Sequence, residues 1–302
     1  GIWRREAIID GGGWQHDTLT EDLDLSYRTQ LKGWRFVFLP NHVAPAELPV
    51  EMNAFKSQQH RWAKGSIQTF LKLMPQILQS DQPFHVKAEA FFHLSANFNY
   101  PLMCVLSVLM APSMIIRYNM GWYEMLLIDV PLFLAATASV ANFYMVCQRE
   151  LYPHTWTERL KYLPFLMSIG IGLAVNNTKA VMEAIFHKPS ELKRTPKYRI
   201  EGTGNGAGGG EWMGKKYRQA VVVQPLVELA LGLYFTATLV YALANGIYGT
   251  VPFLMLFQVG FLYTGLLSNR AVNIGLQVHG GYGFVEDAPI ARLYPDQKIP
   301  EI

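Results

Sequence analysis

Long apolar segments constrain this chain more than any other feature of its sequence. Four stretches, residues 91–116, 124–146, 220–245 and 251–268, are apolar over about the 20 residues that a helix needs to cross a bilayer. Helices satisfy all of their backbone hydrogen bonds internally, as a segment inside lipid must. Each stretch therefore predicts a transmembrane helix, and the chain as a whole predicts an α-helical integral membrane protein.

The composition supports this prediction and excludes nucleic-acid binding. Half of the residues are hydrophobic and 16% are charged, against about 25% charged residues in an ordinary soluble domain. The net charge is only +3, and no basic patch is interleaved with aromatic residues as a nucleic-acid groove requires. We predict a soluble domain over residues 1–90, a transmembrane region over 91–268, the lipid bilayer as a partner, and no nucleic acid.

A fifth apolar segment, residues 163–184, is interpreted from the charges around it. Residues 147–161 and 185–219 are rich in Lys and Arg, whereas the short links 117–123 and 246–250 contain one basic residue between them. Basic loops stay on the cytoplasmic side. Both basic loops share that side if residues 163–184 form an interfacial or re-entrant amphipathic helix, which is our prediction. A full crossing is the alternative.

The soluble part has the pattern of a helix followed by a strand. A capping box of Thr18 and Glu21 predicts a helix over residues 18–32, and residues 34–39 then predict a strand. This pattern indicates the edge of an α/β domain. A second helix is expected over about 53–78, broken near Pro75. The first helix has an apolar stripe with a period of four: Leu19, Leu23, Tyr27 and Leu31.

The triplet Thr20-Glu21-Asp22 is the first candidate for chemistry. Acidic residues are favourable in the first turn of any helix, so a structural role alone would explain them. The functional alternative is a general base, because glycosyl transfer needs a carboxylate that takes the proton of the acceptor hydroxyl.

The second candidate is the helical face formed by Gln58, Arg61 and Trp62, which are spaced i, i+3 and i+4. A Trp beside an Arg provides a platform for a sugar or a diphosphate. The alternative is a surface Arg beside a Trp that anchors the helix at the membrane interface.

The two motifs occur in this order directly before the apolar segments, and there the sequence resembles the family 2 processive glycosyltransferases, such as the cellulose synthases and cellulose-synthase-like mannan synthases. Thr20-Glu21-Asp22 resembles their TED motif, and Gln58-x-x-Arg61-Trp62 resembles their QxxRW motif. The resemblance implies a partial α/β (GT-A-like) cytoplasmic domain. It also implies that Asp22 is the catalytic base and that the other five residues bind substrate: Thr20, Glu21, Gln58, Arg61 and Trp62.

The resemblance further implies inverting transfer from a nucleotide sugar onto a growing β-linked polysaccharide, at the cell (inner) membrane and on its cytoplasmic side. Residues 185–219 resemble the gating loop of the family, with Thr195 and Lys197 at matching positions. UDP-glucose, GDP-mannose and UDP-N-acetylglucosamine all remain open as donors.

The family also requires a divalent cation, Mg²⁺, whose ligands lie upstream of the TED motif. We therefore expect an N-terminally truncated chain that lacks these ligands and is inactive alone. Asp22-Leu23-Asp24 has the D-x-D pattern, but it belongs to the helix of the TED motif, so no metal is assigned to it.

The end of the chain has a different character. Residues 271–302 resemble the C-terminal part of acyl-CoA dehydrogenases, and we predict a non-functional tail over 269–302. Two alternative functions follow from the sequence: a fragment of an acyl-CoA dehydrogenase-like oxidoreductase, which explains only the tail, and a non-catalytic membrane scaffold, which explains only the apolar segments.

Overall fold

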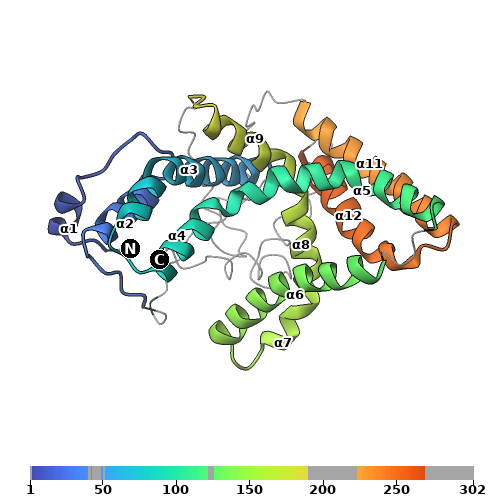
Figure 1. Ribbon diagram of the computed structural model, residues 1–302, viewed down its shortest axis with the longest axis horizontal. Coiled ribbons are helices and arrows are strands. Elements are labelled where there is room, and N and C mark those ends of the chain that lie inside the picture. Colours follow the sequence, from blue (N-terminus) through green and yellow to red (C-terminus); the bar gives the residue numbers. More distant parts are fainter. Residues whose placement is uncertain are drawn as a thin grey trace, which may run out of the picture. The chain divides into compact units, whose positions relative to one another are not determined.

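Every regular element in the described part of this computed structural model is a helix (Figure 1). The chain divides into unit 1, made of Gly1–Leu102, Ala174–Gln219 and Ile299–Ile302, and unit 2, made of Met103–Leu173 and Ala220–Lys298. The structure describes residues 2–39, 42, 49, 52–121, 126–189 and 223–268, with the backbone alone over 126–136.

Unit 1 is built around one long helix, α3 (Met52–Gln79), because three other helices pack against it. These are α2 (Glu21–Leu31), α4 (Phe84–Ser95) and α9 (Ala174–Ile185). A short helix, α1 (Arg5–Asp10), packs on α2, and the 3-10 turn η1 (Ala96–Phe98) follows α4.

Helix α2 confirms three of the four residues of the predicted apolar stripe, since Leu19 lies before the helix, and it does not confirm the predicted start. The helix begins after Thr20 and not at Thr18, and Thr20 makes no side-chain capping bond, so the capping box is wrong. The acidic first turn alone favours this start through the helix dipole. Gly33, with a φ of 91°, follows the end of the helix. Stripe residues Leu23, Tyr27 and Leu31 pack on a core made of Leu73, Met74, Ile77, Ala90 and Leu94.

Helix α3 runs through Pro75 without the predicted break. A proline removes the hydrogen bond to the carbonyl four residues earlier, which here belongs to Leu71. Both Leu71 and Pro75 are exposed, so the helix continues on a side where the freed carbonyl does not have to be buried.

The strand predicted over residues 34–39 is wrong, because the structure gives these residues no regular secondary structure. A strand needs a neighbouring strand for its backbone hydrogen bonds, and the described residues contain none. The side chains are fixed instead by single contacts: Trp34 Nε1 donates to Asp10 Oδ2 at 2.8 Å, and the ring of Phe36 lies 5.0 Å from that of Trp3. The α/β character of this domain is therefore not confirmed.

Unit 2 contains most of the apolar helices, and glycines allow their backbones to approach closely. A Cβ atom at Gly172 would overlap the carbonyl oxygen of Gly260, and one at Gly232 would overlap Leu262. Thr264 Oγ1 donates to the Gly172 carbonyl at 3.1 Å. Small residues at helix contacts are typical of packing inside membranes. Unit 2 contains most of α5 (Asn99–Asn119), together with α6 (Leu126–Leu151), α7 (Trp156–Arg159), α8 (Leu163–Gly172), α11 (Val223–Ala244) and α12 (Val251–Ser268), and the 3-10 turns η3 (Leu160–Tyr162) and η4 (Tyr248–Thr250).

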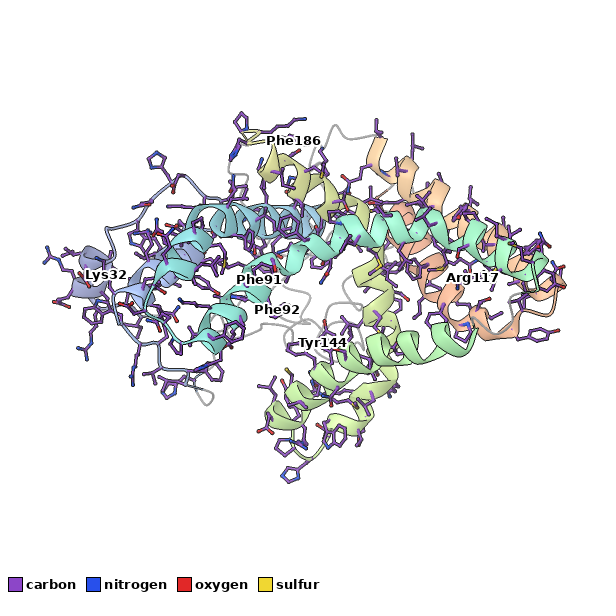
Figure 2. The ribbon with its side chains drawn as sticks, viewed as in Figure 1. Lys32, Phe91, Phe92, Arg117, Tyr144 and Phe186 are labelled. Carbon is purple, nitrogen blue, oxygen red and sulfur yellow. The ribbon has the colours of Figure 1, made fainter. Side chains whose placement is uncertain are left out.

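Three helical segments of the described chain are long and apolar enough to cross a membrane: Phe84–Asn119, Val223–Ala244 and Tyr248–Leu267. They correspond to three of the four predicted spans. The first combines α4, η1 and α5 (Asn99–Asn119) into 36 residues, or about 54 Å at 1.5 Å per residue. This exceeds the roughly 30 Å of the bilayer core, so only part of the segment fits inside it. Phe91 and Phe92 project from its α4 end (Figure 2).

The roles predicted for the two remaining apolar segments, 124–146 and 163–184, stay predictions. The expected span over 124–146 falls on helix α6, of which the first eleven residues are described by backbone alone. The helix predicted over 163–184 is two helices, α8 and α9, bent by 44° at Leu173. A bent pair of this kind is either a re-entrant segment or a broken span, the two interpretations that the sequence left open.

Candidate functional site

The segment before helix α2 is held in place by Arg28, in the last turn of that helix. Arg28 Nη2 donates to the Gly13 carbonyl at 2.9 Å, and Nη1 donates to the Gly11 carbonyl. Gly12 and Gly13 have φ values of 83° and 72°, which residues with a Cβ rarely adopt. The glycines thus allow the turn, and the guanidinium fixes it by two backbone hydrogen bonds.

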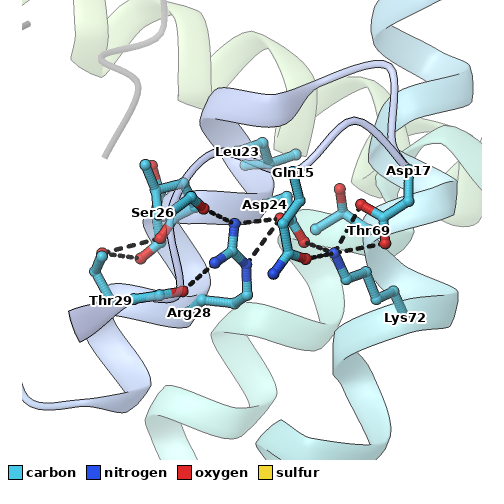
Figure 3. A network of polar contacts seen from close by, with 12 residues as sticks. Gln15, Asp17, Leu23, Asp24, Ser26, Arg28, Thr29, Thr69 and Lys72 are labelled. Carbon is cyan, nitrogen blue, oxygen red and sulfur yellow. Dashed lines mark hydrogen bonds and ion pairs between the residues drawn. The ribbon is translucent and has the colours of Figure 1, made fainter. Parts of the chain in front are cut away.

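Asp24 is the centre of this network (Figure 3). Its side chain is fully buried, and two cations compensate the negative charge of its carboxylate. Arg28 Nε donates to Oδ2 at 2.8 Å, and Lys72 Nζ lies 2.8 Å from Oδ1 as an ion pair without hydrogen-bond geometry. A buried carboxylate requires such partners. Asp24 therefore joins α2 to α3 and has a structural role.

Lys72 extends the same network to the loop before the TED motif. Its Nζ donates to Gln15 Oε1 at 2.6 Å and to Asp17 Oδ1 at 2.9 Å. Slight burial raises the pKa of the Asp17 carboxyl. The hydrogen bond and the charge of Lys72 lower this pKa by more than burial raises it, so the pKa lies below its ordinary value. Lys72 thereby holds the loop on α3 through its hydrogen bonds to Gln15 and Asp17.

The TED motif itself docks on α3 beside the QxxRW motif. Thr20 lies so close to Gly65 that a Cβ atom there would overlap the threonine side chain and backbone. One residue earlier, the Leu19 N–H donates to Gln68 Oε1 at 2.9 Å. Because Gly65 follows Arg61 by four residues, it lies one turn further along the same face of α3. The structure thus places the two motifs on one side of one helix.

The two TED carboxylates differ from Asp24. Glu21 is exposed and Asp22 is half-buried. Asp22 Oδ1 accepts the Leu23 N–H at 2.9 Å, and the described residues offer Asp22 no cation as an ion-pair partner. Of the acids in the first turn of α2, Asp22 is the one that combines partial burial with a carboxylate not neutralised by a neighbouring cation.

The side chains of Gln58, Arg61 and Trp62 make no hydrogen bond or ion pair within the described part of the chain. Gln58 and Arg61 are half-buried, and Trp62 is 44% exposed. Within the described chain the guanidinium of Arg61 makes no hydrogen bond or ion pair, and the structure shows no direct contact between it and Asp22. These groups are positioned by their helix and remain available to an anionic or sugar ligand.

The residues that join the two motifs, Arg28, Gly65, Gln68 and Lys72, were missed by the sequence interpretation. The helical spacing offered a signal for three of them, because Gly65, Gln68 and Lys72 follow Arg61 at i+4, i+7 and i+11. Nothing in the spacing indicated Arg28.

The described residues do not fit a metal site. They contain no group of three or more His, Cys, Asp or Glu side chains that would hold a metal ion, and Asp24 of the D-x-D pattern is already paired with Arg28 and Lys72. Thr195 and Lys197 of the predicted gating loop, and the dehydrogenase-like residues 269–302, lie outside the described residues.

These features define a helical protein that has a polar, partly charged site and helices of membrane-spanning length. The chain belongs to the glycosyl transferase family group 2, because the model of that family matches residues 2–175, more than half of the chain. No solved structure matches it.

The chain is also similar to several plant enzymes. It is 42% identical over 80 residues to glucomannan 4-beta-mannosyltransferase 1 of Oryza sativa subsp. japonica, covering 26% of this chain and 15% of that protein. It is 44% identical over 80 residues to probable glucomannan 4-beta-mannosyltransferase 11 of the same plant, covering 26% and 14%. With glucomannan 4-beta-mannosyltransferase 2 of Arabidopsis thaliana the figures are 42% over 80 residues, 26% and 15%. The match thus spans about one seventh of these relatives.

Proposed function

We propose that this chain is part of an inverting, membrane-bound glycosyltransferase that extends a β-linked polysaccharide from a nucleotide sugar. One observation carries the proposal: Asp22, a carboxylate with no cation beside it among the described residues, is docked through Thr20 and Gly65 onto the helix that presents Arg61 and Trp62. Transfer from a sugar diphosphate requires a base and an anion-binding group, and this arrangement offers both on one side of a single helix.

In the proposed reaction a hydroxyl of the acceptor glycan attacks the anomeric carbon of the donor sugar. The oxygen–carbon bond forms as the bond to the diphosphate breaks, and the configuration inverts from α to β. The hydroxyl proton passes to the carboxylate of Asp22, which therefore acts as a general base. The diphosphate leaves with the bonding electron pair, and the cationic fork of Arg61 stabilises its developing charge.

The remaining motif residues are proposed to bind substrate. Trp62 offers an exposed ring face to a sugar of the acceptor, and Gln58 offers an amide to its hydroxyls. Glu21 and Thr20 complete the acceptor side, with Thr20 also fixing the distance between the motifs. Thr195 and Lys197 are proposed as gating-loop residues on the strength of the sequence motif alone.

The relatives favour a mannosyl donor. The plant proteins that match over 80 residues are named as 4-beta-mannosyltransferases, so we propose GDP-mannose as the donor and a β-linked mannan or glucomannan as the acceptor. Transfer is proposed to depend on Mg²⁺ bound with the diphosphate, and none of the described residues is proposed as its ligand.

The setting of the site is part of the proposal. A GT-A-like α/β fold of the domain that carries residues 1–90 is proposed on the strength of the sequence motifs and the family match. The site is proposed to face the cytoplasm at the cell (inner) membrane, because the basic residues 147–161 and 185–219 flank the apolar helices.

The proposal is tested by expressing the protein that carries this chain and supplying its membranes with GDP-mannose, UDP-glucose or UDP-N-acetylglucosamine, each radiolabelled. We expect incorporation from GDP-mannose into a polymer that a β-mannanase degrades. An α-linked product would contradict inversion, incorporation from another donor alone would contradict the mannosyl assignment, and no incorporation from any donor would contradict the transferase.

A further inference from the structure

The face of α3 that packs against α9 contains a buried cation that the proposed site does not use. Lys64 is fully buried. Its Nζ lies 3.3 Å from Glu183 Oε2 and donates to the Lys188 carbonyl at 2.6 Å. An ammonium group is removed from water only where such partners replace its hydration, so this contact between α3 and α9 is a built feature.

The carboxylate of Glu183 also binds the middle of the QxxRW motif. His60 Nε2 lies 3.0 Å from the same oxygen, Oε2, and a carboxylate accepts, so the ring donates. His60 precedes Arg61, and Lys64 follows Trp62 by two residues. One carboxylate of α9 therefore binds both ends of the helical turn that presents Arg61 and Trp62.

The surroundings of Glu183 make this contact rigid. Ile67 of α3 packs with Val181 and Ala184 of α9 in a fully buried cluster. Asn176 Nδ2 donates to the Lys56 carbonyl at 2.9 Å, two turns before Lys64.

The end of α9 completes the arrangement. His187 adopts a φ of 50°, which is uncommon for a residue with a Cβ. The Lys188 N–H donates to the Glu183 carbonyl at 2.9 Å. This turn brings the Lys188 carbonyl to Lys64. The uncommon backbone conformation of His187 therefore occurs where the buried ammonium group of Lys64 is paired.

We propose that Glu183 is a positioning residue, which fixes the turn of α3 carrying Arg61 and Trp62 so that both side chains are preorganised for a β-linked glycan and a diphosphate. The inference rests on the proposed function for the identity of these ligands, but the positioning itself does not. Glu183 touches neither ligand and acts through His60 and Lys64. Removing it should change the environment of Trp62 and weaken glycan binding, whereas a residue that only stabilises the fold would leave Trp62 unchanged in the folded protein.

The test is ¹⁹F NMR of the full chain in detergent, with 5-fluorotryptophan at its seven Trp positions and the Trp62 signal assigned by Trp62→Phe. Glu183→Gln keeps the shape of the side chain and removes its charge. We expect the Trp62 signal to shift or split while the other signals stay in place. Glu158→Gln, the same change at an exposed residue of α7, should leave the Trp62 signal in place.

A second reading measures the affinity for β-1,4-mannohexaose, which should fall about tenfold in Glu183→Gln, because the turn that carries Trp62 must then be ordered when the glycan binds. Glu183→Gln leaves the buried Lys64 without its carboxylate. Where that variant does not fold, Lys64→Met combined with Glu183→Gln removes both charges and should show the same shift of the Trp62 signal.

The outcomes separate the two proposals. An unchanged Trp62 signal in folded Glu183→Gln, or in the folded double variant, overturns the positioning role. A displaced Trp62 signal in a chain whose wild type binds no mannohexaose supports the positioning role and counts against the proposed glycan site.

Discussion

At the scale of single residues, the acidic residues at the start of α2 differ in their burial and in their ion pairs. Asp24 is fully buried between Arg28 and Lys72, whereas Asp22, two positions earlier, is half-buried and has no such cation among the described residues. Sequence alone showed two aspartates in a D-x-D pattern. Burial and pairing make one of them structural and leave the other able to accept a proton.

This difference predicts the effect of Asp24→Asn. The amide leaves Lys72 and Arg28 without their buried counter-charge, so we expect the variant to be destabilised by about 3–5 kcal/mol, the usual cost of breaking a buried ion pair. Thermal unfolding in detergent measures it. Glu6→Gln, on the exposed side of α1, is the control and should leave the midpoint in place. An Asp24→Asn variant as stable as the wild type would show that the network does not join α2 to α3.

At the scale of helices, α3 organises unit 1 because neighbouring faces of this helix contact different partners. Gly65, Gln68 and Lys72 receive the segment that carries the TED motif, and His60 and Lys64 receive α9. The QxxRW motif lies between these contacts. A single helix thereby fixes the relation of the two motifs to each other.

The sequence predicted those parts of the fold that depend on local periodicity. The stripe on α2, the long helix α3 and three apolar helices of spanning length are all present. The strand over 34–39 and the break at Pro75 are not, because a strand depends on a distant partner and a proline in a helix depends on whether the carbonyl it leaves unpaired reaches water. The contacts of Glu183 could not be predicted from local periodicity either, because their partners are more than a hundred residues away in the sequence.

The orientation of the helices is predicted from charge and is testable at two exposed positions of the described chain. In a background with Cys104 and Cys147 replaced by Ala, we expect Met120→Cys, after α5, to react with an impermeant maleimide in intact cells. His154→Cys, between α6 and α7, should react only after permeabilisation, because basic loops stay inside. Labelling of His154→Cys from outside would place the basic loop on the wrong side and contradict the assignment.

At the scale of the whole molecule, the chain joins a polar site to membrane-length helices without a long connection. Helix α3 ends at Gln79, and four residues separate it from the continuous helical segment Phe84–Asn119. Both the candidate site and this membrane-length segment lie within residues 2–175, which match the family model.

The central claim is that Asp22 takes the proton of the acceptor hydroxyl, and Asp22→Asn tests it most directly. The amide keeps the shape of the side chain but cannot act as a base. We expect sugar transfer by the protein that carries this chain to fall about 10²–10⁴-fold, with its affinity for the nucleotide sugar unchanged in a parallel binding measurement. Polymer formation by Asp22→Asn at the wild-type rate would contradict the account.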